Sequence, residues 1–209
     1  MVAAVEVKSI KGAEWRDLGM PETLWNCRVK EFGPLVVSIG TQGRKLYAKE
    51  LERLNVYLLE EPMATEDMKG NAELNRFTTI PVAGFETAYI LHEFKQFIDQ
   101  QVIDIAQPDA IWTGGLTECK KIADYADANH VKVVLHCFSS ALCLASNLHL
   151  LASVRNGDMV EYDVTDNPLR NDILVQPFEV GRDGRMELSD RPGLGIQINW
   201  DEAQKYIVS

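Results

Sequence analysis

Five ionisable residues each close a short apolar run in the sequence. They are Glu60, Glu86, Asp109, His136 and Glu161. Carboxylates and imidazoles are the side chains that bind divalent cations and move protons. Next to a buried strand such a group is costly unless it is paired or bound to a metal. The pattern therefore predicts a site for cation binding and proton transfer.

The apolar runs themselves predict the strands of a parallel sheet. They span 56–60, 80–86, 103–109, 131–136 and 159–161. Each has the length and β-branched content of a buried strand, and a segment with helical spacing separates it from the next. Thr117 is the expected N-cap of one of these helices. Alternation of strand and helix favours an α/β fold, a (β/α) TIM-type barrel or part of one, in which the strand ends converge on one rim.

The first third of the chain is less regular than the rest. Its second and third apolar runs are joined by residues 30–34, whereas a parallel crossover needs a dozen residues or more. We therefore predict an irregular N-terminal segment over 1–55, barrel units over 56–190 and a tail over 191–209. A full eight-unit barrel has about 250 residues. The 209 residues of this chain predict a barrel that is incomplete at its N-terminal side.

The composition and net charge of the chain limit the kinds of molecule that it is expected to bind. The chain is 46% hydrophobic and 25% charged, as in ordinary globular proteins. Its net charge of −10 argues against nucleic acid or an anionic membrane as partner. We see no secretory signal and no apolar run long enough to span a bilayer. The four cysteines form no C-x-x-C pair, which favours reduced, buried thiols and a cytoplasmic location.

The residue types predict different chemical roles for the residues at the strand ends. A carboxylate such as Asp109 beside His136 would fix the tautomer of the ring and raise its basicity, which suits a general base. Glu60 and Glu86 offer the hard oxygen ligands that Mg²⁺ prefers. Glu161 is expected to act on a substrate carboxylate from the opposite side. Any one of these residues alone would more often be structural, so the prediction depends on the set.

From Leu59 onward the chain resembles the C-terminal barrel region of the enolase superfamily, in its mandelate racemase and muconate lactonizing enzyme branch. The spacing of the shared landmarks agrees along most of the chain. These landmarks are Glu60-Glu61-Pro62, Gly84-Phe85-Glu86-Thr87, Gln107-Pro108-Asp109, Gly114-Gly115-Leu116-Thr117-Glu118, His136, Glu161-Tyr162-Asp163 and Pro192-Gly193-Leu194-Gly195.

The resemblance implies a Mg²⁺-dependent acid-sugar dehydratase or racemase. Such an enzyme removes the proton α to a carboxylate and passes through an enolate. By resemblance Glu60 and Glu86 are metal ligands, and the His136–Asp109 dyad is one base. Glu161 would hydrogen-bond to the carboxylate of the substrate, which is expected to be a small sugar acid or 2-hydroxy acid.

The early part of the chain departs from the family pattern. Ile39 stands where the family has its third metal-binding carboxylate, and an isoleucine cannot bind a cation. Lys30 is the candidate for the base on the opposite face of the substrate. The capping domain of the family has no counterpart, and Phe85 stands where many members have glycine. The alternative is a truncated, catalytically impaired homologue or a structural barrel fragment. Because an incomplete barrel exposes strand edges, we expect a homo-oligomer.

Overall fold

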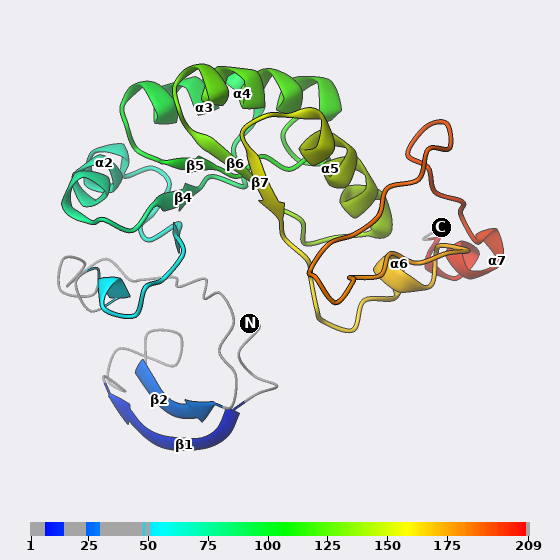
Figure 1. The fold of residues 1–209 in the computed structure, drawn as a ribbon, viewed down its shortest axis with the longest axis horizontal. Helices are drawn as coiled ribbons and strands as arrows, with labels where there is room; N and C mark the ends of the chain where they lie inside the picture. Colours follow the sequence, from blue (N-terminus) through cyan, green and yellow to red (C-terminus); the bar gives the residue numbers. More distant parts are fainter. Residues whose placement is uncertain (1–6, 15–23, 30–47, 49–50, 208–209) are drawn as a thin grey trace. The chain divides into compact units, whose positions relative to one another are not determined.

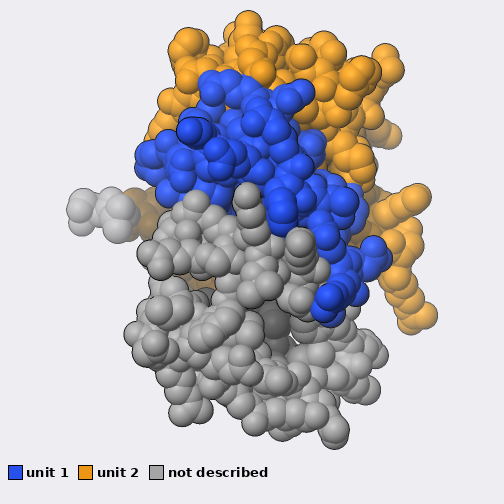
Figure 2. All heavy atoms as spheres, turned by 90° about the vertical axis from the view of Figure 1, so that its left-hand side faces the viewer, with its two compact units in different colours: residues 1–84, 100–104 blue, residues 85–99, 105–209 orange. Residues whose placement is uncertain are grey.

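The structure is a computed structural model. It describes residues 7–14, 24–29, 48 and 51–207. The chain divides into two compact units (Figure 2). The first covers 1–84 and 100–104, and the second covers 85–99 and 105–209. The predicted boundaries at residues 55 and 190 stay a prediction.

An antiparallel pair of strands opens the first unit. β1 spans Val7–Glu14 and β2 spans Leu24–Val29, with Val7 paired to Val29 and Glu14 paired to Leu24. The third apolar run lies outside the described residues, as do Lys30 and Ile39. The predicted relation between the second and third runs therefore stays a prediction.

The first unit continues with one strand–helix–strand repeat. β3 spans Leu59–Glu60, α2 spans Met68–Phe77 and β4 spans Val82–Gly84. β3 and β4 are parallel neighbours. Asp67 caps α2, because its Oδ1 accepts a hydrogen bond from the Gly70 N–H at 2.9 Å. Leu74 of α2 is buried and belongs to the same apolar cluster as Met63. This repeat confirms the predicted alternation.

The second unit holds the remaining parallel strands and their helices. Its elements are α3 (Ile90–Asp99), β5 (Ile105–Ala106), α4 (Leu116–Ala128), β6 (Lys132–Leu135), α5 (Ala141–Ser153) and β7 (Gly157–Val160). β6 pairs in parallel with both β5 and β7. In Figure 1, α3 and α4 lie together on one side of these strands, and α5 packs on β7. The full strand order β3-β4-β5-β6-β7 confirms the predicted α/β fold with a parallel sheet.

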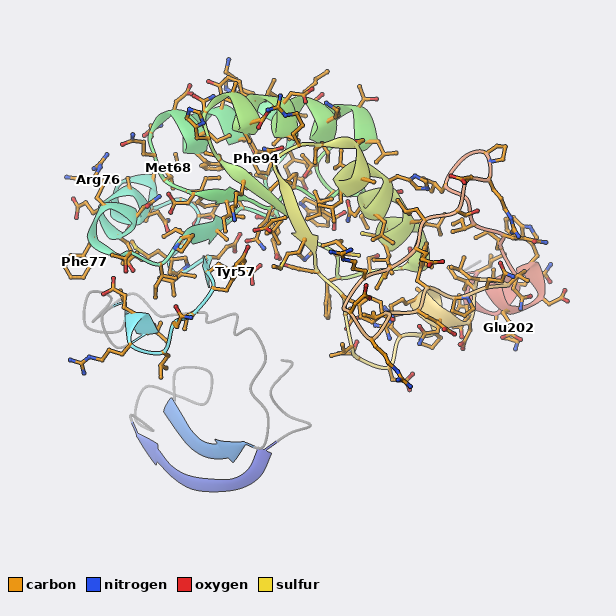
Figure 3. All side chains as sticks on the ribbon, viewed as in Figure 1. Tyr57, Met68, Arg76, Phe77, Phe94 and Glu202 are labelled. Atoms are coloured by element: carbon orange, nitrogen blue, oxygen red, sulfur yellow. The ribbon has the colours of Figure 1, made fainter. Side chains whose placement is uncertain are left out.

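Buried apolar side chains join the helices of the second unit to its strands. In β6, Val133, Val134 and Leu135 are all buried, as expected of a strand that is covered on both faces. Phe94 of α3 is fully buried in the layer between helix and strands (Figure 3). The neighbouring Phe97 stacks on Phe85 with ring centroids 3.9 Å apart.

Two local predictions are wrong. α4 begins at Leu116 with Gly115 as its N-cap, rather than with Thr117. Gly115 has φ 89°, a left-handed conformation that glycine adopts at little cost, so the chain enters the helix two residues earlier. The run that ends at Glu161 is no buried strand either, because Met159 of β7 is exposed. β7 is the last strand in the described order, and Asp158 and Met159, which point to opposite faces of it, are both exposed.

The C-terminal part of the second unit is held by short elements. α6 spans Pro168–Asn171, α7 spans Trp200–Ala203 and a 3₁₀ turn spans Gln204–Tyr206. Leu174 and Ile198 form an antiparallel bridge, and Leu174 is buried against Ala141 of α5. Among the described residues, every helix is too short or too polar to cross a membrane.

Candidate active site

His136 and Asp109 form a direct pair. Asp109 lies three residues after β5, and His136 is the residue that follows β6. The Nδ1 atom of His136 is 2.9 Å from Oδ2 of Asp109. The side chain of Asp109 is 3% exposed and that of His136 is 17% exposed. The parallel pairing of β5 and β6 thus brings together two residues that are 27 positions apart.

The other ring nitrogen of His136 faces a second carboxylate. Nε2 is 3.2 Å from Oε2 of Glu86, whose side chain is 34% exposed. The imidazole therefore lies between two acidic groups, the buried Asp109 on Nδ1 and the more exposed Glu86 on Nε2. With Nδ1 held by Asp109, Nε2 is the nitrogen that can exchange a proton with another molecule.

Glu86 follows an unusual stretch of backbone. Phe85 has φ 71°, a left-handed conformation that is rare for a bulky residue. Its ring is nevertheless buried, stacked on Phe97. A glycine would adopt this conformation at less cost than phenylalanine. Packing of the Phe85 ring thus supports the turn that presents Glu86.

Glu161 contacts both of the neighbouring strand ends. Its Oε1 accepts a hydrogen bond from Nε2 of Gln107 at 2.7 Å. Its Oε2 accepts one from the N–H of Cys137 at 3.4 Å. Gln107 precedes Asp109 by two residues, and Cys137 follows His136 directly. Glu161 is therefore joined to the strands that carry the dyad.

Two predicted site residues do not belong to the second unit. Glu60 ends β3 in the first unit, whereas Glu86, Asp109, His136 and Glu161 all belong to the second unit. Lys30 lies outside the described residues. The roles of these two residues stay predictions.

Buried residues that the sequence analysis did not single out support the dyad. Cys143 donates from Sγ to Oδ1 and Oδ2 of Asp109, at 3.3 and 3.5 Å. Thr113 accepts from the Asp109 N–H at its Oγ1. Asn147 of α5 donates to the carbonyl oxygen of His136. The signal for Asn147 was present in the sequence, since it is a polar residue within the apolar run of α5.

These contacts set the charges of the pair. Burial alone would raise the pKa of Asp109, but hydrogen bonds from the His136 ring and the Ile111 N–H outweigh it and hold the pKa below its ordinary value. Burial alone would lower the pKa of His136. Its hydrogen bond to Asp109 and the charges of the neighbouring carboxylates instead raise that pKa to about 9. Both effects favour an imidazolium–carboxylate pair.

The donor types suit a hard cation, but the described set is incomplete. Glu60 and Glu86 carry the carboxylate oxygens that Mg²⁺ prefers. Within the part of the chain that the structure describes, however, His, Cys, Asp and Glu side chains nowhere gather in a group of three or more that could hold a metal ion. Glu86 is turned toward His136 instead. Within the second unit, Glu86 alone would supply only part of a cation site.

The profile of the "Enolase C-terminal domain-like" family matches residues 41–203. The chain belongs to this family. Its membership of the enolase superfamily, in the mandelate racemase and muconate lactonizing enzyme branch, confirms the resemblance seen in the motifs. The matched residues include all the strand ends discussed above.

Relatives within the superfamily are enzymes of acid-sugar metabolism. The chain is 33% identical over 158 residues to arabinonate dehydratase of Saccharolobus solfataricus, covering 76% of this chain and 42% of the relative. It is 30% identical to D-xylonate dehydratase of Haloferax volcanii, covering 78% and 40%. The crystal structure of the 3,6-anhydro-D-galactonate cycloisomerase from Zobellia galactanivorans superposes with a TM-score of 0.76 at 32% identity, covering 85% and 52%. The chain thus spans about two-fifths of the curated relatives.

Proposed function

We propose that this chain is the barrel region of an acid-sugar dehydratase that removes the proton α to a carboxylate. The observation that carries the proposal is the His136–Asp109 pair, with Nδ1 held at 2.9 Å and Nε2 on the far side of the ring. An imidazole that is fixed in this way can take a proton only through Nε2. A general base of this kind typically contributes about 10²–10⁴-fold to a rate.

The proton would move between Nε2 of His136 and the α-carbon of the substrate. In the described geometry Glu86 pairs with that nitrogen, and the raised pKa of His136 favours a proton on it. The ring must therefore lose its Nε2 proton, and the Glu86 carboxylate must turn away, before the neutral imidazole can act as the base. The electron pair left on the α-carbon spreads into the substrate carboxylate as an enolate. In a dehydration, the hydroxyl group on the next carbon would leave as water with the proton returned from Nε2 of His136, and the resulting enol would tautomerise to the 2-keto-3-deoxy acid. In an exchange, the proton would return to the α-carbon.

Glu161 is proposed to orient the substrate carboxylate, and Glu60 and Glu86 to hold Mg²⁺. Support for Glu161 comes from its contacts with Gln107 and Cys137, which tie it to the dyad strands. Support for Glu60 comes from its place at the end of β3, the parallel neighbour of β4. A bound Mg²⁺ would supply positive charge that stabilises the enolate. Lys30 remains the proposed base for the opposite face.

The proposed substrate is a small sugar acid, and the proposed setting is the cytoplasm. The names of the relatives favour dehydration over racemisation, because they include arabinonate and D-xylonate dehydratases. Cys119, Cys137 and Cys143 are free and buried, which is consistent with a reducing compartment. We retain the expectation of a homo-oligomer as part of the proposal.

A direct assay tests the dehydratase function. The protein is incubated with Mg²⁺ and arabinonate, D-xylonate or D-galactonate, and 2-keto-3-deoxy acid is measured. The expected result is product with at least one substrate, and its loss in His136→Asn. His92→Asn is the matched control, because His92 is exposed on α3 and contacts Gln96 rather than the dyad. Equal activity in His136→Asn and wild type would refute the proposal.

Calorimetric titration with Mg²⁺ tests the cation site. We expect weak binding, because Mg²⁺ demands near-ideal octahedral geometry and Ile39 stands where the family has its third carboxylate ligand. Any binding should weaken further in Glu86→Gln. A tight site in wild type would show that the donor set is complete, and would contradict the partial site inferred above.

A further inference from the structure

Asn147 is a fully buried polar residue on a mostly apolar helix. α5 buries Leu144, Ala145 and Leu148 around it. A buried amide without hydrogen bonds would be strongly unfavourable. The partners of Asn147 therefore explain why a polar side chain is tolerated at this position.

All three partners of Asn147 lie beside the dyad. Its Oδ1 accepts a hydrogen bond from the Ala110 N–H at 3.0 Å. Its Nδ2 donates to the carbonyl oxygen of His136 at 2.8 Å and to Sγ of Cys143 at 3.3 Å. A backbone N–H can only donate and a carbonyl can only accept, so these partners fix the orientation of the amide. One side chain thus connects the residue after Asp109 to His136 itself.

This connection acts beyond the end of the strand pairing. β5 and β6 pair at Ile105 with Lys132 and at Ala106 with Val133. Asp109 and His136 each lie three residues past the last of these pairs. A short Nδ1–Oδ2 hydrogen bond requires the two backbones to stay in register there. Asn147 supplies a bridge across that stretch.

A second residue on the same face of α5 completes the support. Cys143 precedes Asn147 by four positions, one helical turn, so the two side chains are neighbours. While Asn147 holds the backbones, Cys143 contacts both carboxylate oxygens of Asp109. α5 thus contacts the dyad at the backbone and at the carboxylate.

We propose that Asn147 is a positioning residue that sets the His136–Asp109 hydrogen bond. The inference rests on the proposed function, in which this pair is the general base. In this role Asn147 does not need to contact the substrate. Misplacement of reacting groups by 1 Å can cost about 100-fold in rate, so a loss of that order in kcat with little change in KM is expected for Asn147→Ala.

The decisive measurement needs no substrate. In ¹⁵N-histidine-labelled protein, the Nδ1 and Nε2 chemical shifts of His136 report which nitrogen carries the proton and whether it is hydrogen-bonded; His136→Asn assigns the signals. Asn147→Ala should move these shifts toward those of free imidazole. Asn156→Ala is the matched control, because Asn156 uses its amide to join α4 to the start of β6, through Ala123 and Val131. It should leave the shifts unchanged.

The outcomes separate this inference from the proposed function. Wild-type shifts without a hydrogen-bonded Nδ1 would contradict the dyad itself. A hydrogen-bonded Nδ1 in wild type that is unchanged in folded Asn147→Ala would overturn only the role of Asn147. If that variant does not fold, Asn147→Asp is measured instead, because it keeps the acceptor for Ala110 and loses the donor to His136. Failure of both variants to fold, with Asn156→Ala folded, would make Asn147 purely structural and overturn the proposal.

Discussion

Asp109 and His136 are held by buried contacts from several elements, whereas Glu86 is one-third exposed and follows a residue with a left-handed backbone. Asp109 receives hydrogen bonds from the ring, from a thiol and from a backbone N–H. The contrast indicates that the proposed base is held in a fixed geometry, next to a carboxylate that can change partners. Glu161 is intermediate, since it is tied to both dyad strands but lies on a loop after an exposed strand.

The largest expected difference between these regions is in stability. Asp109→Ala should lower the free energy of unfolding by about 3–5 kcal/mol, because it removes the buried partner of His136 Nδ1 and leaves the Ile111 N–H and the Cys143 thiol without this acceptor. Glu86→Ala should cost about 0–1 kcal/mol, as for exposed pairs. Chemical denaturation at neutral pH measures both. Equal costs would remove the distinction between a fixed dyad and a more adaptable carboxylate.

The loop that follows Glu161 should respond to acid. Asp163 accepts hydrogen bonds from the Thr165 N–H and Oγ1 and pairs with Arg170 at 3.5 Å. Burial alone would raise the pKa of Asp163, but the Thr165 bonds outweigh it and lower that pKa. A lowered pKa stabilises the fold above the unfolded value of about 3.9, and this stability is lost as pH falls through the folded value.

Asp163→Asn tests that loop. At neutral pH the variant should be less stable by about 1–3 kcal/mol, the range for hydrogen bonds to charged groups. The difference from wild type should shrink as pH falls below about 3.9, where the unfolded carboxylate takes up a proton, and through the lower pKa of the folded state. Denaturation curves across this range measure it. A difference that is independent of pH would mean that the charge of Asp163 does not stabilise the loop.

A smaller effect is expected at the residue before Glu86. Phe85→Ala and Phe85→Gly both remove the ring that stacks on Phe97, but only alanine keeps a Cβ at φ 71°. The glycine variant should therefore be the more stable of the two by about 1 kcal/mol, the order of the cost of a left-handed conformation. Thermal unfolding of the pair measures the difference. An alanine variant that is equally or more stable would show that the backbone there is unstrained.

The parallel sheet and the dyad were predictable because both follow from local patterns. Apolar runs separated by helical spacing specify strands, and parallel strands bring residues such as Asp109 and His136 to one edge. The family resemblance rested on motifs at those same strand ends. The contact of Glu86 with His136 was predicted only as a shared location, because the sequence does not fix a rotamer.

Other features depend on tertiary packing and escaped prediction. The exposure of Met159 depends on what packs over β7, and the periodicity of the sequence does not show that. Asn147 and Cys143 reach the dyad through the docking of α5, a contact between segments that are distant in sequence. The left-handed conformation of Gly115 replaced the side-chain cap expected at Thr117. A polar residue inside an apolar helix was the one usable clue to the Asn147 contacts.

Exchange of a substrate α-proton with solvent deuterium is the most direct test of His136 as a base. Because proton removal precedes both dehydration and racemisation, exchange reports this step whichever product forms. The protein is incubated in D₂O with Mg²⁺ and arabinonate, D-xylonate or D-galactonate, and the α-proton signal is followed by ¹H NMR. Wild type and His92→Asn should incorporate deuterium at the α-position of at least one of these compounds. His136→Asn should slow that exchange by about 10²–10⁴-fold. Exchange at the wild-type rate in His136→Asn would contradict the role of His136 as the base.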